Sequence, residues 1–141
     1  MRKMDHGLWL RIGFGIFLVI WGLDRVIRAK LWASDSLMGH FYGSIGLMTG
    51  FVIALGIVQL LIALSFFTNY QVRCTSLILF AMLIVSTFVT IVPLFTYLFK
   101  GGNPIPSILF SDHFPLLAGA WAIYAHSRKS SRSAMPKRRK K

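Results

Sequence analysis

Glutamate is absent from this sequence of 141 residues, and the only acidic side chains are four aspartates, Asp5, Asp24, Asp35 and Asp112. Charged residues of both signs make up only 14% of the chain, whereas hydrophobic residues make up 55%. Soluble domains average about 25% charged residues, so this chain has too little charge to coat a soluble surface. The shortage of charge therefore predicts a protein whose surface contacts lipid.

Cysteine is equally scarce, because Cys74 stands alone and excludes both an intrachain disulfide and a Cys-x-x-Cys motif. The sequence also has no Walker motif, no GxGxxG, no GxSxG and no His or Glu spacing typical of metal ligands. We therefore expect no catalytic residue of a known signature and no metal site. Whether the chain is an enzyme stays open; any activity would be that of a subunit of a quinone-linked oxidoreductase.

Positive charge is plentiful, with a formal net charge of +12, but it is unevenly distributed. Eight of the sixteen basic residues lie in the last fourteen positions, directly after an apolar segment. A nucleic-acid-binding domain would instead spread basic charge over a folded face. A basic tail beside a membrane segment attracts anionic lipid, by about 1 kcal/mol per residue near the surface. We expect anionic lipid, and not nucleic acid, as the partner of this tail.

Four apolar stretches dominate the chain, at residues 8–27, 45–67, 74–99 and 105–125. A bilayer core about 30 Å thick needs roughly 20 helical residues, so each stretch is a candidate span. In the last one, either Asp112 lies below the outer surface, or the chain enters irregularly and becomes helical near His113. The pattern predicts an all-α, four-helix transmembrane bundle over residues 1–126, followed by a basic, disordered cytoplasmic tail over 127–141.

The basic residues also predict an orientation, because an even number of spans places both termini on one side. The eight basic residues of the tail outnumber those expected on the opposite side, which are Arg25, Arg28, Lys30 and Lys100. By the positive-inside rule, both termini should be cytoplasmic. The expected location is a cell membrane, the inner membrane of a bacterium.

The first span has one face of small and basic residues, spaced by three or four positions: Arg11, Gly15, Leu18, Gly22 and Arg25. Two glycines on one face permit close contact with another helix. Arg11 either snorkels to the headgroups or reaches a partner inside the bundle. The candidate partner is Gln59 of the second span, so Arg11 and Gln59 form a predicted interhelical pair.

The third span carries Ser86, Thr90 and Pro93 on one face. Proline frees a backbone carbonyl and should kink the helix. The two hydroxyls either satisfy the local backbone or line a small cavity at the kink.

A polar set is expected at the outer side of the bundle, composed of Asp24, Arg25, His40, Asp112 and His113. Ionisable groups in a membrane are costly, so they usually pair or take part in function. The set could be a salt-bridged lid or a polar mouth for a quinone headgroup. A membrane-accessible pocket lined by Trp21, His40, Asp112 or His113 would favour quinone, whereas a solid bundle with an exposed small-residue face would favour a protein partner.

Three segments of the chain resemble the DoxX family of small four-helix membrane proteins. They are Leu10-Arg11-Ile12-Gly13, the run from Leu18 to Arg25 that ends in Trp-Gly-Leu-Asp-Arg, and Gly56-Ile57-Val58-Gln59-Leu60-Leu61. The hairpin Phe67–Arg73 is also similar, and the likeness spans about residues 8–90. The family usually has glutamate where this chain has Gln59. The resemblance implies a link to quinone-coupled sulfur oxidation or to redox-stress assemblies.

Two functions follow from these observations. The first is a noncatalytic subunit or assembly partner of a membrane complex, which fits the small size and the glycine faces and allows a membrane-protein partner or a homo-oligomer. The alternative is a quinone-binding, redox-associated subunit of a respiratory or sulfur-oxidising system. Transport is less favoured, because the polar residues do not line up across the bilayer and no inverted repeat is evident.

Overall fold

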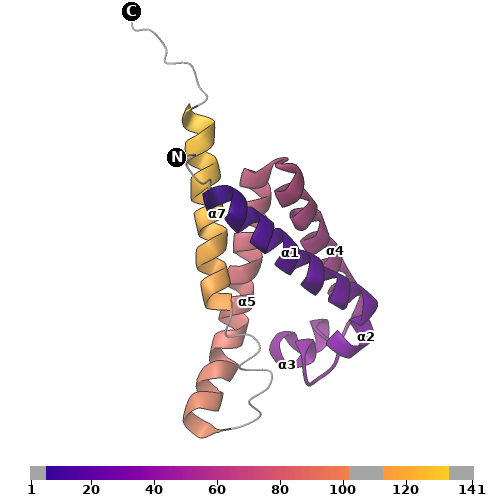
Figure 1. Ribbon diagram of the computed structural model, residues 1–141. Helices are drawn as coiled ribbons and strands as arrows, with labels where there is room; N and C mark the ends of the chain where they lie inside the picture. Colours follow the sequence, from indigo (N-terminus) through magenta and orange to yellow (C-terminus); the bar gives the residue numbers. More distant parts are fainter. Residues whose placement is uncertain (1–5, 102–112, 134–141) are drawn as a thin grey trace, which may run out of the picture.

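The computed structural model describes residues 6–101 and 113–133, and every secondary-structure element within these ranges is helical (Figure 1). The long helices are α1 (His6–Ile27), α4 (Thr49–Thr68), α5 (Val72–Lys100) and α7 (His113–Ser133). The first three lie close to the predicted stretches 8–27, 45–67 and 74–99, and α7 overlaps the later part of 105–125, so the described residues confirm the all-α class. α7 begins at His113, and residues 105–112 of the last stretch lie outside the described residues, so the two interpretations of that segment stay predictions.

The long helices associate as two antiparallel pairs, with α1 lying along α4 and α5 lying along α7 (Figure 1). A tight turn joins α4 to α5, and its residues Asn69 and Gln71 adopt left-handed backbone conformations with φ of 57° and 47°. Near the other ends of the chain, Gly7 lies against the ring of His126. The start of α1 and the later part of α7 are therefore neighbours in space.

Short helices in the first connection cover the opposite end of the α1–α4 pair. They are α2 (Ala29–Trp32), α3 (Met38–Tyr42) and the 3-10 helix η1 (Gly43–Ile45). Trp32, Met38 and Phe41 are buried in one cluster together with Val52 of α4. This connection is thus a packed cap, and it brings aromatic side chains to the end of α1.

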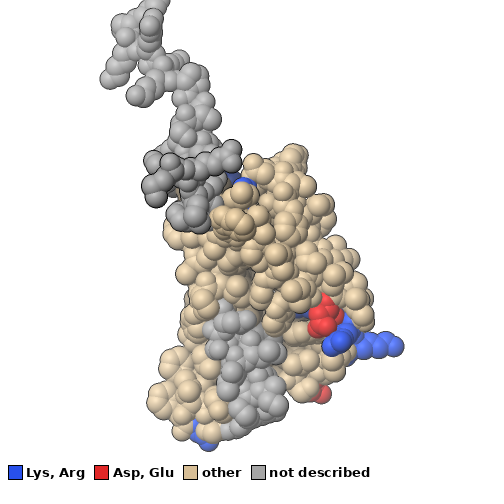
Figure 2. All heavy atoms as spheres, viewed as in Figure 1, with Lys and Arg blue, Asp and Glu red and all other residues tan. Residues whose placement is uncertain are grey.

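The face of the long helices seen in Figure 2 carries few charged side chains. Large side chains such as Ile20, Leu61 and Phe88 are exposed by 61%, 60% and 72%, while charged side chains gather at the corner between α1 and α2. Of the described helices, α4 and α5 are long and apolar enough to cross a membrane. Their 20 and 29 residues correspond to about 30 Å and about 44 Å of helix.

Glycines make the contact between α1 and α4 close, as the small-residue face of the first span predicted. A Cβ atom at Gly22 would lie 3.0 Å from the backbone oxygen of Gly56, and one at Gly56 would lie 2.8 Å from that of Gly22. Both distances are too short for a side chain to fit without moving backbone. Such backbone-to-backbone packing is the known role of small residues between membrane helices.

The boundary predicted between the bundle and its tail lies inside a helix. Residue 127 was expected to begin a disordered tail, but α7 continues to Ser133. Ser127 itself donates its hydroxyl to the carbonyl of Tyr124, at 2.8 Å, as a helical serine commonly does. The prediction for residues 134–141 lies outside the described residues.

We expect Gly22→Val to weaken the α1–α4 contact, because the new methyl groups would push against the backbone of Gly56. The free energy of unfolding should fall by about 1–3 kcal/mol. Gly13→Val on the same helix is the control, since a Cβ at Gly13 would meet nothing within 4 Å. Thermal unfolding in detergent micelles measures both variants, and equal losses would show that the glycine contact is unimportant.

Candidate ligand-binding site

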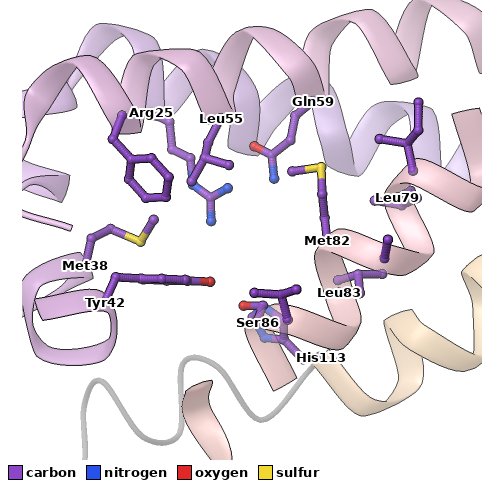
Figure 3. Close-up of a pocket in the computed structure, with 14 residues that line it drawn as sticks. Arg25, Met38, Tyr42, Leu55, Gln59, Leu79, Met82, Leu83, Ser86 and His113 are labelled. Atoms are coloured by element: carbon purple, nitrogen blue, oxygen red, sulfur yellow. The ribbon is translucent and has the colours of Figure 1, made fainter. Parts of the chain in front are cut away.

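A cavity of about 450 Å³ lies between the two helix pairs and the α3 cap (Figure 3). Its volume is within the range of about 300–1,000 Å³ typical of small-molecule sites. Most of the wall is apolar, with Met38, Leu55, Leu79 and Met82 among its residues. Its polar lining residues are Arg25, Tyr42, Gln59, Ser86 and His113.

The cavity reaches the outer surface of the bundle along α5. Ile78 and Val85 line the cavity, and yet their side chains are exposed by 50% and 56%. Ala81, between them on the same helix, is also both exposed and part of the wall. The wall of the cavity is therefore continuous with the apolar outer face of the protein.

Arg25 is the most unusual residue of the site, because it is a buried cation, with only 7% of its surface exposed. Its guanidinium carbon lies 5.6 Å from the ring centroid of Trp21 and 5.4 Å from that of Trp32. Among the described residues it has no ion pair and no hydrogen bond, and its Nε is buried without a partner. Figure 3 shows the guanidinium pointing into the cavity. The two indoles thus hold a charge that forms no ion pair with any acid of the described residues.

The neighbouring acid, Asp24, is directed elsewhere. Trp32 donates its indole Nε1 to Asp24 Oδ2 at 2.6 Å, and Arg28 Nε lies 3.4 Å from Asp24 Oδ1. Consecutive helical residues point about 100° apart, so Asp24 faces the cap while Arg25 faces the bundle. Asp24 therefore orients Trp32 beneath the guanidinium and does not form an ion pair with Arg25.

Gln59 projects from α4 into the same cavity, where its Oε1 is buried without a hydrogen-bond partner (Figure 3). The glycine contact explains why Arg25 and Gln59 share this space. A Cβ atom at Gly56 would lie only 3.2 Å from the Cβ of Arg25, so Arg25 crosses α4 one turn before Gln59. Two polar side chains on adjacent helices are thereby left open toward the cavity.

Ser86 and His113 link α5 to α7 at the far wall. The Ser86 Oγ and His113 Nε2 atoms are 2.8 Å apart, and both residues are buried. Thr90 donates its hydroxyl to the carbonyl of Ser86 at 2.8 Å, so this threonine satisfies the local backbone, as one of the two interpretations required. α5 remains helical through Pro93, and the kink at this residue stays a prediction.

The predicted outer polar set is only partly assembled. Arg25 and His113 line one cavity, as the cluster required. Asp24 belongs to the cap, and His40 is exposed, with its ring edge-on to Phe41 at 5.0 Å, so neither lines the cavity. Asp112 lies outside the described residues.

The predicted pairing of Arg11 with Gln59 is wrong. Arg11 Nη1 instead donates to Asn69 Oδ1 in the turn between α4 and α5. The register of the α1–α4 contact is the reason, since Gly22, eleven residues beyond Arg11, is the residue that meets Gly56. Arg11 is therefore about 16 Å along α1 from the point where this helix meets Gly56, one turn from Gln59 on α4.

Sequence reasoning missed Tyr42 and Trp32 as parts of the site. Both lie in the connection after α1, where no periodic pattern indicates which side chains return to the bundle. One signal was available, because Trp21 precedes Arg25 by four positions and so shares its helix face. An aromatic residue at that spacing could have indicated a cation–π contact.

No protein-family model, curated protein or solved structure matches this chain. The resemblance to DoxX proteins stays a prediction from the residues quoted for it. The assignment of a function therefore rests on the geometry of the cavity.

We expect Arg25→Met to raise the stability of the ligand-free protein, because it removes a buried charge that has no counter-ion among the described residues. Replacing buried ions with apolar groups of similar size often stabilises proteins by about 1–4 kcal/mol. The loss of the contacts with Trp21 and Trp32 will offset part of this gain. Thermal unfolding of delipidated protein in a neutral detergent measures the change.

Arg28→Met is the matched control for this substitution. Arg28 is 66% exposed and pairs with Asp24 at the surface, and such pairs contribute about 0–1 kcal/mol. A strong loss of stability in Arg25→Met, larger than that in Arg28→Met, would mean that Arg25 holds the fold together and is not an uncompensated charge.

Proposed function

We propose that this chain is a four-span membrane protein that binds a lipophilic small molecule between its helices. The ligand's polar head is held by Arg25 and Gln59, and its apolar part occupies the rest of the cavity. The observation that carries this proposal is a largely apolar cavity lined by Arg25 and Gln59, each of which has one buried polar atom, Nε and Oε1, with no hydrogen-bond partner among the described residues. Native proteins leave few such groups unsatisfied.

The lengths and surfaces of α1 and α7 support four spans. The 22 residues of α1 correspond to about 33 Å of helix, close to the thickness of a bilayer core, and the 15 residues of α7 that precede Arg128 correspond to about 22 Å. The side of α1 that faces away from α4 exposes Trp9, Ile16, Ile20 and Ile27. In water such a strip would be costly, whereas in a bilayer it is the expected lipid-facing surface.

The positions of the chain's ends support a shared side for both termini. Gly7 of α1 and His126 of α7 lie together, and the basic tail follows α7. The positive-inside rule then places this side in the cytoplasm, in the inner membrane of a bacterium. The turn at Asn69 and Gln71, which closes the same end of the bundle, marks the inner boundary.

From that boundary the depth of the site can be derived. Gln59 lies ten residues before Asn69, and Ser86 lies fourteen residues after Val72, which corresponds to about 15 Å and about 21 Å. The polar end of the cavity is thus at or beyond the middle of the bilayer. An ionisable side chain at such depth usually marks a functional site, and Arg25 is at this level.

A quinone has the required form, because its carbonyl oxygens accept hydrogen bonds and its tail is apolar. Arg25 can donate to one carbonyl, while the amide of Gln59 can also donate once it turns. The cavity favours this ligand-binding alternative over a solid bundle with a purely structural role. A place in a redox-linked membrane complex of the DoxX type is compatible with it and remains part of the proposal.

The four-span arrangement predicts that a reporter fused to Lys141 will stay in the cytoplasm. A cytoplasm-dependent fluorescent protein should be active there, while alkaline phosphatase should be inactive. Fusions truncated after Lys100 are the control, because three spans would place the reporter outside and reverse both signals. Phosphatase activity at Lys141 would contradict the topology.

Ligand binding predicts stabilisation by lipophilic molecules in detergent. A ligand at one hundred times its Kd should stabilise the protein by about 2.7 kcal/mol. Two probes should be tested, decylubiquinone with a neutral head and oleate with an anionic head. Leu55→Trp, which fills the cavity, should abolish the shift, whereas Leu61→Trp on the exposed side of α4 should preserve it. The proposal fails if no probe stabilises the protein or if Leu55→Trp responds like the wild type.

A further inference from the structure

The wall of the cavity carries an unbalanced charge. Of its described residues, Arg25 is the one with a permanent charge, and none is acidic. Asp24, the nearest acid along the chain, is occupied by Trp32 and Arg28. The described part of the site is therefore cationic and has no internal counter-ion.

A neutral head would leave this imbalance in place. Guanidinium remains charged under all ordinary conditions, and a charge removed from water is stabilised mainly by an opposite charge. A carbonyl oxygen can accept one of its hydrogen bonds but supplies no net charge. An anionic head would supply both a hydrogen-bond acceptor and a negative charge, so the electrostatics of the site favour an anion.

Donor groups also converge on one place in the cavity. Figure 3 shows Arg25, Tyr42 and Gln59 turning their polar ends into the same space, from α1, α3 and α4. A carboxylate can accept about four hydrogen bonds and pairs with guanidinium in a two-pronged geometry. Because Trp21 and Trp32 contact the guanidinium, it is held in place before a ligand arrives.

We propose that the ligand is a single-chain amphiphile with a carboxylate head, of the free fatty acid class. One guanidinium balances one carboxylate, which favours this head over a doubly charged phosphate. The remaining wall suits a flexible chain, because Met38 and Met82 are adaptable side chains that fill irregular gaps. This inference rests on the proposed function and names the ligand class of the same site.

The experiment compares ligands that differ in the head alone. Purified full-length protein in a neutral detergent at pH 8 is titrated with oleate, oleyl alcohol, dodecyl phosphate and decylubiquinone, and calorimetry gives each Kd. Oleate should bind at least about tenfold more tightly than oleyl alcohol, as expected for hydrogen bonds that involve a charged partner. Dodecyl phosphate and decylubiquinone should also bind more weakly than oleate.

Substitutions then assign this preference to Arg25. Arg25→Met should bring oleate to the affinity of oleyl alcohol, whereas Arg11→Met, which removes a cation from the same helix far from the cavity, should retain the wild-type preference. Arg25→Lys keeps the charge but loses the two-pronged geometry, so oleate should still bind more tightly than oleyl alcohol. If Arg25→Met does not fold, Arg25→Lys decides the matter, because the loss of the two-pronged geometry should reduce the preference for oleate over oleyl alcohol, and an unchanged preference would contradict the assignment to Arg25.

The outcomes separate this inference from the proposed function. If decylubiquinone or oleyl alcohol binds as tightly as oleate, the carboxylate assignment is overturned and the lipophilic site survives. Tighter binding of dodecyl phosphate would overturn the assignment in favour of a phosphate head. If none of the four probes binds, the proposed function itself fails.

Discussion

The contact between Gly22 and Gly56 is the constraint on which the rest of the structure depends. Because neither residue has a side chain, α1 and α4 approach until their backbones touch. That approach sets the register of the two helices and brings Arg25 across α4 beside Gln59. Larger residues at the contact would separate the helices and remove the two polar groups from a common space.

The site conflicts with the stability of the bundle in which it lies. A buried guanidinium without a counter-ion and an amide oxygen without a donor are both unfavourable. The faces of Trp21 and Trp32 offset part of the cost of the charge. Local rules of packing and pairing are commonly broken at functional sites, and here Arg25 and Gln59 break them together.

Much of the fold could be predicted from the sequence, because length and hydropathy determine which segments form long helices in an apolar chain. The glycine face of α1 was also predictable, since spacings of three and four positions define one side of a helix. The partner of Arg11 was not, because depth in a membrane does not determine the register between helices. That register depends on which glycines meet.

The parts of the site that escaped prediction belong to the first connection. Tyr42 reaches the cavity, and Trp32 reaches the guanidinium of Arg25, because α2 and α3 fold back over the end of α4. No repeat or periodic pattern in this segment indicates that return. The sequence also could not predict which way the Asp24 carboxylate points, because its hydrogen-bond partner Trp32 lies in the same connection.

The exposure of Ile78 and Val85 along the edge of the cavity has a consequence for how the site is filled. If the protein spans a membrane and binds a ligand as proposed, an entrance on the apolar face of α5 would draw on molecules already dissolved among the acyl chains, and not on those in water. Occupancy would then follow the mole fraction of the ligand in the bilayer. A molecule with negligible aqueous solubility could saturate such a site, and the surrounding lipid composition would determine how full it is.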